Sequence, residues 1–366
     1  MVKKILITAG GTGGHLYPAQ ALAQQLIAQG HEVLFVAGGL NSNRYFDRQT
    51  FPFKEVAGHS FNFKNPIKAF KTLFGVTQGI FQCRKIMKNF LPHIVVGFGS
   101  YYSVPTLLAA KWQGIPIVLH EANSVPGKAN RWFAPYAVCT GIHFPLTALL
   151  LKGKTCEVGL PLRADYRYTP KPNLEAKNYF NLDPDRLTLL IFGGSQGADA
   201  INQLIKKGLD AEQDFPAQVI HLTGNDKEVA ELTNFYASRY IKACVKPFEK
   251  AMYKAWQAAD IFVGRAGAST IAEAIEFEVP GLLIPYPYAT DNHQEKNADF
   301  FVKTVKGGKK WLQSELTPLL LKNEIYELFQ EVSLTQTRQS IRTYKQSLKN
   351  LDLCQLVLKV MEDENK

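Results

Sequence analysis

Strand-like apolar runs alternate with amphipathic helical patterns along the whole chain, and no other feature restricts its fold so strongly. This alternation predicts parallel sheets whose strands are joined through helices. The same opening occurs twice, because an apolar strand runs into a glycine loop at Gly10–Gly14 and again at Gly193–Gly197. We therefore expect an α/β protein of two Rossmann-like domains, whose parallel sheets face each other across a cleft and bind ligands at the carboxyl ends of their strands.

The predicted strands form two groups, one in each half of the chain. They lie at about 3–8, 32–37, 93–97 and 115–119 in the first half, and at about 187–192, 217–222, 241–245, 260–263 and 281–285 in the second. The clearest helices of the first half follow His15, Asn65 and Ser103. The polar segment 158–172 is the best boundary between the two groups.

Domain organisation follows from these two groups. We expect an N-terminal domain over residues 1–160 and a C-terminal domain over residues 161–336. The last segment has apolar residues at a helical period, which predicts one long terminal helix over about 337–361. This helix is expected to pack across the halves and to complete the N-terminal domain.

Composition agrees with this organisation and suggests the kind of partner. A chain of 366 residues is too long for one ordinary α/β core. The net charge of +10 and the pI of about 9.2 imply an anionic partner, which can be nucleic acid, a phosphorylated ligand or an acidic membrane surface. The 5 cysteines are scattered without zinc-site spacing, which indicates reduced thiols in a cytosolic protein. No apolar stretch approaches the ~20 residues that span a bilayer, so we expect a soluble or surface-attached protein.

The stretch 264–273 indicates a nucleotide site. It follows an apolar strand, turns at glycine and enters a helix that Ser269 or Thr270 is expected to open. A helix N-terminus offers unpaired N–H groups and partial positive charge, which suit a phosphate. Glu273 lies one turn further along the same face, where its carboxylate can accept hydrogen bonds from both hydroxyls of a ribose. The polar loop 291–294 then suggests a nucleotide diphosphate with a polar group beyond it.

Other nucleotide-binding classes are disfavoured by the loops themselves. Leu16 stands where the dinucleotide fingerprint requires its third glycine, and the second strand ends in Gly38 and Gly39 instead of an acidic residue. A hydride-transfer enzyme is therefore not expected. The sequence has no P-loop signature and none of the RRM, KH or helix-turn-helix patterns, so neither a P-loop ATPase nor a nucleic-acid-binding protein is expected.

Three strand-to-helix turns of the first half carry polar groups. The loop Gly10–Gly14 forms a cradle of backbone N–H groups for an anion, and His15 at its end can take a proton from an attacking hydroxyl at neutral pH. A histidine satisfied locally at a helix start is the alternative. The turn 97–103 is rich in hydroxyls, and the turn 120–128 contains Asn123, which can both donate to and accept from a sugar. Turns after neighbouring strands should converge at one edge of the sheet.

Taken together, these motifs resemble those of the peptidoglycan N-acetylglucosaminyltransferase family, which converts lipid I into lipid II, and the likeness covers nearly the whole chain. The matching motifs are Gly10 to His15, His120 to Asn123, Gly193 to Ala198, Arg265 to Glu273, and His293-Gln294 with Asn297-Ala298. The resemblance implies a GT-B architecture and an inverting UDP-N-acetylglucosamine-dependent hexosyltransferase that uses no cofactor and no metal. The implied acceptor is the 4-hydroxyl of the muramoyl sugar on a polyprenyl diphosphate. The sequence lacks a DxD-type acidic cluster, which agrees with a metal-free reaction.

The resemblance also assigns donor-binding residues. Glu273 would hold the uridine ribose, the segment 248–252 would contact uracil through its main chain, and Arg163 would face the phosphates. The residues carried over for UDP-N-acetylglucosamine are Thr12, Gly13, Gly14, Asn123, Arg163, Ser195, Phe248, Glu249, Ala268, Ser269, Thr270, Glu273, His293 and Gln294. Among them Ser195 and Ala268 to Thr270 would lie about the diphosphate. His293 and Gln294 would read the hydroxyls of the sugar.

The acceptor side and the catalytic base come from the first half of the chain. The implied acceptor-binding residues are Gly11, Thr12, His15, Gly99, Ser100 and Tyr101. His15 is the favoured base, and Glu121 is a rival base or an orienting partner, between which the sequence does not decide. The chain departs from many relatives at Ser100, Ala122 and Leu160, where they have glycine, glutamine and asparagine, which puts acceptor-side detail and a polar interdomain contact in question.

A lipid acceptor implies contact with a membrane. The segment 64–88 mixes lysine and arginine with phenylalanine and isoleucine, which suits an anionic bilayer surface, although an amphipathic helix buried on its own domain is the alternative. We expect a peripheral protein on the cytoplasmic face of the bacterial inner membrane, with other cell-wall and division proteins as possible partners.

Three other functions share parts of this pattern. Another GT-B transferase that glycosylates a diacylglycerol would have the same donor half and differ in the acceptor motifs. A sugar-nucleotide-binding subunit that is not itself catalytic would need only Glu273 and its helix, so the presence of the His15 loop argues against it. An epimerase of UDP-N-acetylglucosamine would need no lipid acceptor.

Overall fold

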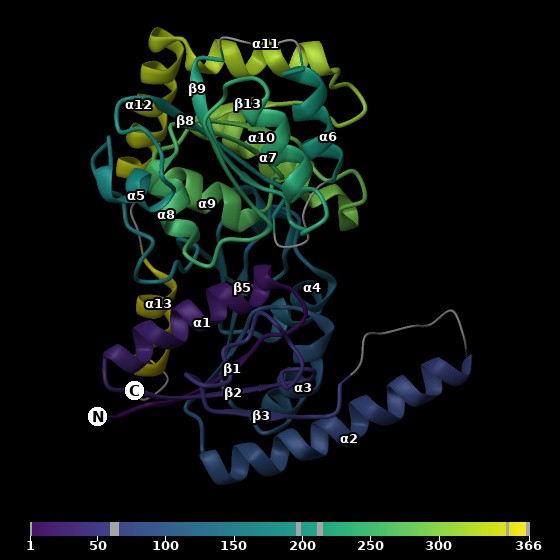
Figure 1. Ribbon diagram of the computed structural model, residues 1–366. Helices are drawn as coiled ribbons and strands as arrows, with labels where there is room; N and C mark the ends of the chain where they lie inside the picture. The colour runs from purple at the N-terminus through teal and green to yellow at the C-terminus, as the bar shows by residue number, and fades with distance from the viewer. Residues whose placement is uncertain (1, 59–65, 195–198, 211–214, 349–350, 364–366) are drawn as a thin grey trace. The chain divides into compact units, whose positions relative to one another are not determined.

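The computed structural model describes residues 2–58, 66–194, 199–210, 215–348 and 351–363. The chain divides into two compact units, residues 1–164 with 350–366 and residues 165–349 (Figure 1). The division therefore falls after Ala164, four residues beyond the expected end of the first domain, and the second unit continues to residue 349. Each unit contains a parallel sheet, which confirms the predicted Rossmann-like domains. The cleft between them stays a prediction.

The first unit is built on a sheet of 7 parallel strands among its described residues, in the order β3-β2-β1-β4-β5-β6-β7. The strands are β1 (Lys4–Thr8), β2 (Glu32–Ala37), β3 (Phe53–Glu55), β4 (Ile94–Gly97), β5 (Ile117–Glu121), β6 (Cys139–Ile142) and β7 (Thr155–Glu157). The helices are α1 (Gly13–Ala28), α2 (Pro66–Phe90), α3 (Val104–Trp112), α4 (Lys128–Phe133) and α13 (Leu353–Asp363), with the short 3₁₀ turns η1 (Tyr101–Ser103), η2 (Ala134–Tyr136) and η3 (Pro145–Leu150). The direction of the strand order reverses between β1 and β4, and such a point is where α/β sheets bind ligands.

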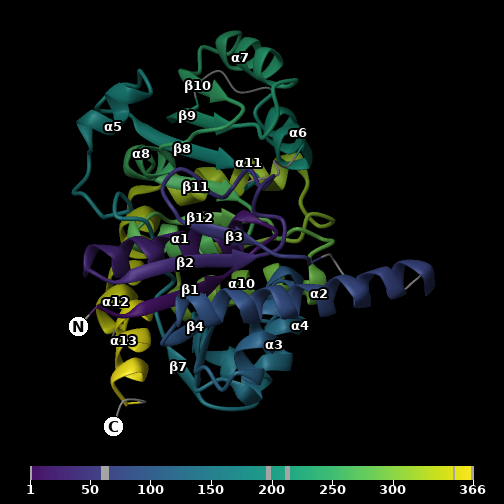
Figure 2. The ribbon, with the colours of Figure 1, turned by 90° about the horizontal axis from the view of Figure 1, so that it is seen from below.

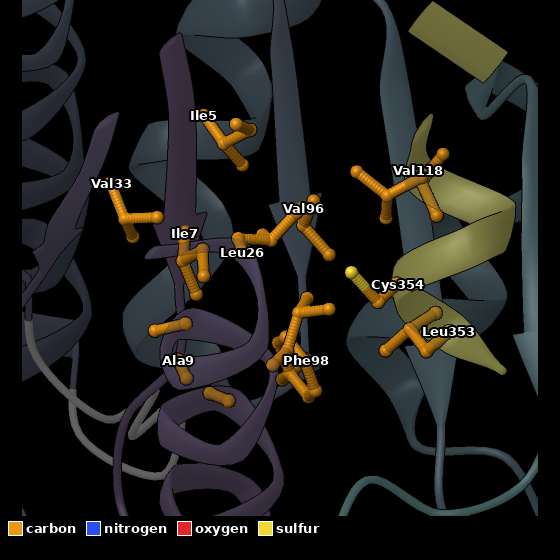
Figure 3. Close-up of a cluster of buried hydrophobic side chains, with 14 of the residues drawn as sticks. Ile5, Ile7, Ala9, Leu26, Val33, Val96, Phe98, Val118, Leu353 and Cys354 are labelled. Atoms are coloured by element: carbon orange, nitrogen blue, oxygen red, sulfur yellow. The ribbon is translucent and has the colours of Figure 1, made fainter. Parts of the chain in front are cut away.

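Both faces of this sheet are buried, as the continuous apolar strands require. One face packs against α1 and α13, and Ile5, Ile7, Val96 and Val118 of the strands lie there beside Leu353 of α13 (Figure 3). The opposite face packs against α2 and α3. In both ribbon views one end of α2 extends well beyond the sheet (Figure 1, Figure 2).

The second unit repeats this plan with 6 parallel strands among the residues described, in the order β10-β9-β8-β11-β12-β13. The strands are β8 (Leu187–Phe192), β9 (Ala217–Leu222), β10 (Ala243–Lys246), β11 (Ile261–Gly264), β12 (Gly281–Leu283) and β13 (Gly308–Lys310). The helices are α5 (Leu174–Tyr179), α6 (Asp199–Gly208), α7 (Val229–Ala237), α8 (Met252–Ala258), α9 (Ala268–Glu276), α10 (His293–Phe300), α11 (Pro318–Phe329) and α12 (Glu331–Ser347), with the 3₁₀ turn η4 (Thr290–Asn292) and the π-helical turn η5 (Phe301–Val305). The order here reverses between β8 and β11.

The prediction of one long terminal helix over about 337–361 is wrong, because two helices occupy this segment. Leu348 has an extended backbone (φ −64°, ψ 108°) and ends α12. A reciprocal capping box then starts α13: the Gln355 N–H donates to Asp352 Oδ1 at 2.6 Å, and the Asp352 N–H donates to Gln355 Oε1 at 3.1 Å. The apolar period runs through both helices, so periodicity alone did not reveal the break.

Ion pairs fix α12 to the second unit. Arg338 contacts Asp260 at 3.3 Å, and Arg342 contacts Glu278 at 2.8 Å. One turn further along the helix, Lys345 contacts Glu276 at the end of α9. The spacing of four and three residues places these three cations on one face of α12. This face packs against α9, which carries the candidate nucleotide residues.

Three histidines, of which His120 and His221 are buried and His143 is half-buried, remain neutral in the folded protein. Burial lowers the pKa of His120 and of His221 to about 3 and that of His143 to about 4. In the second unit His221 is satisfied on both ring nitrogens, since Nδ1 lies 2.9 Å from the Tyr236 hydroxyl and Nε2 lies 3.0 Å from Asn202 Oδ1. A neutral His221 ring can make both hydrogen bonds, with one nitrogen as donor and the other as acceptor.

The free energy of unfolding should therefore fall as the solution becomes acidic. A histidine in the unfolded chain has a pKa of ~6.5. Below that pH the unfolded chain binds protons at these histidines, whereas the folded chain binds them only when its own, lower pKa values are reached. Each histidine contributes a loss of about 1.4 kcal/mol per pH unit in this window. Urea unfolding at pH 7.5, 6.5 and 5.5 measures the slope. In the variant His221→Gln the free energy of unfolding should fall less steeply with decreasing pH, by the contribution of one proton. Equal slopes of unfolding free energy against pH for the two proteins would contradict this assignment.

Candidate active site

The glycine loop after β1 leads directly into α1. Gly11 has a positive φ of 82°, and Thr12 is the N-cap residue with φ −96° and ψ 165°. The helix begins at Gly13, three residues earlier than a helix that starts after His15, so His15 lies inside its first turn. Thr12 Oγ1 lies 3.2 Å from Nδ1 of the partly buried His15. A Cβ at Gly13 would lie 2.9 Å from the Tyr17 ring, so a larger residue here would displace that ring.

The turn after β4 lies against this glycine loop. Gly99 and Ser100 both have positive φ, 77° and 71°, and the Ser103 hydroxyl donates to their carbonyls at 2.6 and 2.7 Å. Ser100 combines φ 71° with ψ 149°, a region that is essentially restricted to glycine. The Ser100 hydroxyl would lie 3.3 Å from a Cβ placed on Gly11, so the predicted acceptor residues of the two turns meet.

The third turn is organised by Glu121, the last residue of β5. Its Oε1 accepts the Asn123 N–H at 2.9 Å, and its Oε2 accepts the Gly127 N–H at 2.9 Å and the Asn130 side-chain amide at 2.8 Å. Burial raises the pKa of Glu121, and these hydrogen bonds act in the opposite direction. Glu121 thus has the contacts of a residue that orients the turn carrying Asn123.

Two histidines beside this turn, the buried His120 and the half-buried His143, were assigned no role from the sequence. His120 packs against Phe98 with ring centres 5.1 Å apart, and the nearby His143 and His15 add to the lowering of the His120 pKa that burial causes. The position of His120 at the end of a predicted strand, next to Glu121 and Asn123, is the sequence signal that could have identified it. His143 follows β6 and had no local signal.

In the second unit the helix after β11 begins earlier than predicted. Gly267 is the N-cap residue, with φ −67° and ψ 150°, and Ala268 is the first residue of α9. The expectation that Ser269 or Thr270 opens the helix is therefore wrong by one or two residues. The prediction failed because it looked for a hydroxyl side chain at the N-cap, whereas glycine can occupy the N-cap position without a side-chain hydrogen bond. Ala268 to Thr270 then form the first turn, where N–H groups suit an anion.

Glu273 follows one turn later, and its carboxylate is held by Trp256 of α8. The indole Nε1–H donates to Glu273 Oε2 at 2.5 Å. Trp256 is fully buried and packs edge-on against Phe192 and Phe262 with ring centres 5.5 and 5.0 Å away. A rigid aromatic cluster thus fixes the carboxylate that was predicted to bind ribose. The sequence could not identify this donor, because Trp256 lies in a different helix.

Arg265, which the sequence analysis quoted only as part of a motif, organises the loop after β12. It donates to the carbonyls of Ile284 and Pro285, both at 3.2 Å, and to Gln313 Oε1 at 2.7 Å, while burial lowers its pKa. Gln294 Oε1 accepts the backbone N–H of Tyr286 at 2.9 Å.

His293 and the segment after β10 complete the described donor residues. His293 Nδ1 lies 2.8 Å from the Thr290 carbonyl. Phe248 is exposed, whereas Glu249 is buried and accepts hydrogen bonds from Lys246 Nζ at 2.8 Å and the Ala251 N–H at 2.9 Å. Burial opposes the ionisation of Glu249, but the hydrogen bonds from Lys246, the Ala251 N–H and Tyr179, together with the charge of Lys246, outweigh it and the pKa is lowered.

The predicted residues therefore gather in two sets, one at the carboxyl edge of each sheet. The set of the first unit follows β1, β4 and β5 and comprises Gly11, Thr12, Gly13, Gly14, His15, Gly99, Ser100, Tyr101, Glu121 and Asn123. Arg163, also in the first unit, has its guanidinium carbon 5.4 Å from the centre of the Tyr17 ring of α1. The set of the second unit follows β10, β11 and β12 and comprises Phe248, Glu249, Ala268, Ser269, Thr270, Glu273, His293 and Gln294. Ser195 lies outside the described residues. No cluster of three or more His, Cys, Asp or Glu side chains arranged for a metal ion occurs within the described part of the chain.

Family models match both units. Residues 5–142 match the glycosyltransferase family 28 N-terminal domain, and residues 188–352 match the glycosyltransferase family 28 C-terminal domain. Two Rossmann-like units of this kind define a glycosyltransferase of the GT-B class.

Two curated relatives identify the family within this class to which the chain belongs. A UDP-N-acetylglucosamine–N-acetylmuramyl-(pentapeptide) pyrophosphoryl-undecaprenol N-acetylglucosamine transferase of Protochlamydia amoebophila is 53% identical over 99% of this chain and 97% of its own. A relative of the same name from Chlamydia pneumoniae is 34% identical over 94% and 95% of the two chains. The chain belongs to this family of N-acetylglucosamine transferases within glycosyltransferase family 28.

Solved structures agree with this membership. The crystal structure of Acinetobacter baumannii MurG is 28% identical, covers 99% of both chains and superposes with a TM-score of 0.77. The rice protein Os79 in complex with UDP covers 100% of both chains with a TM-score of 0.72, but it is only 12% identical and so supports the fold alone.

Proposed function

We propose that the chain transfers N-acetylglucosamine from UDP-N-acetylglucosamine to the 4-hydroxyl of the muramoyl sugar of lipid I, which gives lipid II for peptidoglycan. The observation that carries the proposal is that one chain holds both the His15 glycine loop and the α9 start with Glu273, in a family whose named relatives perform this transfer. The proposed reaction inverts the configuration at the sugar's anomeric carbon and uses no metal ion. A single displacement needs only a base for the hydroxyl and groups that stabilise the departing diphosphate.

His15 is the proposed base. When its Nδ1–H donates to Thr12 Oγ1, Nε2 becomes the acceptor that takes the proton of the attacking hydroxyl. The hydroxyl oxygen then bonds to C1 of N-acetylglucosamine as the bond from C1 to the diphosphate oxygen breaks, and UDP leaves with the electron pair. Glu121 is buried and bound by three donors, which supports an orienting role for it over that of base.

The donor is proposed to lie on the second unit. Glu273 would accept hydrogen bonds from the ribose hydroxyls, and the first turn of α9 would face the diphosphate. Stabilisation of the leaving group by N–H groups and a helix end then takes the place that a metal ion has in other transferases.

The first experiment tests the donor, the acceptor and the base together. Purified protein in EDTA should move label from radioactive UDP-N-acetylglucosamine into the lipid fraction when a short-chain lipid I analogue is present. His15→Gln should lower kcat by about 10² to 10⁴, the usual size of general base catalysis, with little change in the KM for the nucleotide sugar. Near-normal turnover of this variant would exclude His15 as base, and UDP release without labelled lipid would point to a different acceptor.

A second prediction concerns the ribose. Wild-type protein should bind UDP more tightly than 2′-deoxy-UDP, and Glu273→Gln should weaken UDP binding and reduce this preference, because a charged acceptor for the hydroxyls is lost. Trp256→Phe keeps Glu273 but removes the donor that orients it, so part of the preference should be lost. Calorimetric titration of both nucleotides measures the ratio. A loss that is equal for UDP and 2′-deoxy-UDP would indicate a general effect on folding and contradict the ribose contact.

Attachment to the cytoplasmic face of the inner membrane is a separate proposal, supported by an exposed surface of the first unit that we call the aromatic patch. Phe81 and Trp112 are 61% and 59% exposed with ring centres 6.1 Å apart, and the Arg84 guanidinium lies 3.8 Å from the Trp112 ring centre. Lys111 lies 3.1 Å from the ring centre of the exposed Tyr136. Aromatic rings beside cations suit an anionic lipid surface. No helix in the described ranges is long and apolar enough to cross a bilayer. Other cell-wall and division proteins stay predicted partners.

The aromatic patch should control binding to vesicles. Wild-type protein should sediment with phosphatidylglycerol vesicles more than with phosphatidylcholine vesicles, and added salt should weaken the binding because it screens the cations. The double variant Phe81→Ser with Trp112→Ser should lose at least about tenfold in affinity, the equivalent of ~1.4 kcal/mol. Val332→Ser, at an exposed apolar position of the second unit, is the control. If the double variant and the control bind alike, the patch is not the contact.

A further inference from the structure

The loop after β12 carries two exposed tyrosines whose rings have no part in the roles above. Tyr286 is 43% exposed and Tyr288 is 83% exposed, and their ring centres lie 5.6 Å apart at an interplanar angle of 73°. Exposure alone is ordinary for a surface tyrosine, and Tyr240 after α7 is 90% exposed. The pair after β12 differs because the fold holds both of its residues in place.

A hydrogen-bonded turn places Tyr288 at the tip of this loop. The Ala289 N–H donates to the Tyr286 carbonyl at 3.2 Å, so these four residues form a β-turn with Pro287 at its second position. Proline suits that position because its ring fixes φ. The Asn292 N–H then donates to the Ala289 carbonyl at 2.9 Å and leads the chain into η4 and α10. The backbone of Tyr288 is thus ordered by bonds within the loop.

Tyr286 ties this turn to residues of the candidate site. Its N–H donates to Gln294 Oε1 at 2.9 Å, and its ring centre lies 5.5 Å from the guanidinium carbon of the buried Arg265. Arg265 also fixes the start of the loop through the two carbonyls described above. Because Tyr286 is held, the Tyr288 ring that packs against it edge-on has a preferred position. Little conformational entropy is then lost when this ring contacts a ligand.

The order of the strands places the tyrosine loop beyond the start of α9. β8, β11 and β12 are neighbours in that order (Figure 2). On one side, Glu273 is bound by Trp256 of α8, whose ring packs against Phe192 of β8. The first turn of α9 follows β11, and the tyrosine loop follows β12 on the other side. A nucleotide sugar with its ribose at Glu273 and its diphosphate at the first turn of α9 would therefore extend its hexose towards this loop.

A hexose fits the exposed face of a tyrosine ring. A pyranose has hydroxyl groups around its edge and C–H groups on its faces, so one face can lie on an aromatic ring while the hydroxyls bind polar side chains. The face of an aromatic ring is partially negative and attracts the C–H groups. His293 and Gln294, the predicted readers of the hydroxyls, follow in the same segment. The flat contact and the polar contacts would thus come from one part of the chain.

We propose that Tyr288 binds the hexose of the nucleotide sugar by stacking its ring on a C–H face of the sugar, with Tyr286 as the positioning residue. The inference rests on the proposed function, because it takes a UDP-hexose as the donor. It adds an apolar contact to the hydroxyl contacts assigned above. Tyr288 then contributes to the affinity for the sugar and not to that for the nucleotide.

Calorimetric titration of the full-length protein with UDP and with UDP-N-acetylglucosamine tests the stacking and requires no acceptor. Tyr288→Ala should weaken the binding of UDP-N-acetylglucosamine by about threefold to tenfold, the range of one aromatic contact, and change the Kd of UDP by less than about twofold. Because the Tyr288 side chain is largely exposed, this variant should fold as the wild type does. A role of Tyr288 in loop structure alone would not separate the two ligands.

Three further variants separate stacking from other effects of the side chain. Tyr288→Phe keeps the ring and should keep the wild-type ratio of the two Kd values. Tyr288→Leu is apolar but has no flat face, so it should behave as Tyr288→Ala does. Tyr240→Ala is the control, since it also removes an exposed tyrosine from the second unit and should leave the ratio unchanged.

Stacking is overturned if Tyr288→Ala keeps the Kd of UDP-N-acetylglucosamine within about twofold of wild type, or if both ligands lose affinity equally. It is also overturned if Tyr288→Phe binds as weakly as Tyr288→Ala, which would assign the effect to the hydroxyl, or if Tyr240→Ala has the same effect. Failure of the proposed function is a separate result: wild-type protein would then bind the nucleotide sugar in the titration and form no labelled lipid in the transfer assay.

Discussion

The reversal of strand order between β1 and β4, and between β8 and β11, is the constraint on which the candidate site depends. Right-handed crossovers send the helices after these neighbouring strands to opposite faces of the sheet, and the loops that leave them diverge at the carboxyl edge. Every described site residue assigned to the second unit follows β10, β11 or β12, and in the first unit the three turns follow β1, β4 and β5. The topology thus decides where polar groups collect before any side chain is chosen.

Within that edge, the close approach of backbone segments determines which residues are tolerated. The Tyr102 side chain leaves no space for a Cβ at Gly10. A Cβ at Gly38 would lie 2.9 Å from the Gly58 carbonyl and 3.0 Å from the Tyr102 ring, and one at Gly13 would displace the Tyr17 ring. The glycines therefore serve packing as well as the proposed anion binding, since the same absence of a side chain admits the aromatic rings and exposes the N–H groups. In the second unit the equivalent rigidity comes from side chains, because Arg265 donates to the carbonyls of Ile284 and Pro285, at the start of the loop that leads to His293 and Gln294, and to Gln313 Oε1.

The sequence predicted what depends on local pattern. Alternating apolar runs identified the parallel sheets, and the glycine loops identified the edge at which the candidate residues lie. It did not predict what depends on partners distant in the chain: the indole of Trp256 on Glu273, the three donors around Glu121 and the left-handed backbone of Ser100. The break before α13 had a local signal in the Asp352 and Gln355 capping box, but the apolar period continued across it and outweighed that signal.

The buried histidines of the first unit bear on how a base at His15 could work. In the proposed mechanism His15 becomes cationic as it takes the proton, and a second positive charge nearby would oppose that step. Burial prevents such a charge, because the pKa of His120 is about 3 and that of His143 about 4, so both rings are neutral at neutral pH. His120, at the end of β5 against Phe98, therefore adds no positive charge beside the glycine loop, which agrees with His15 as the proposed base.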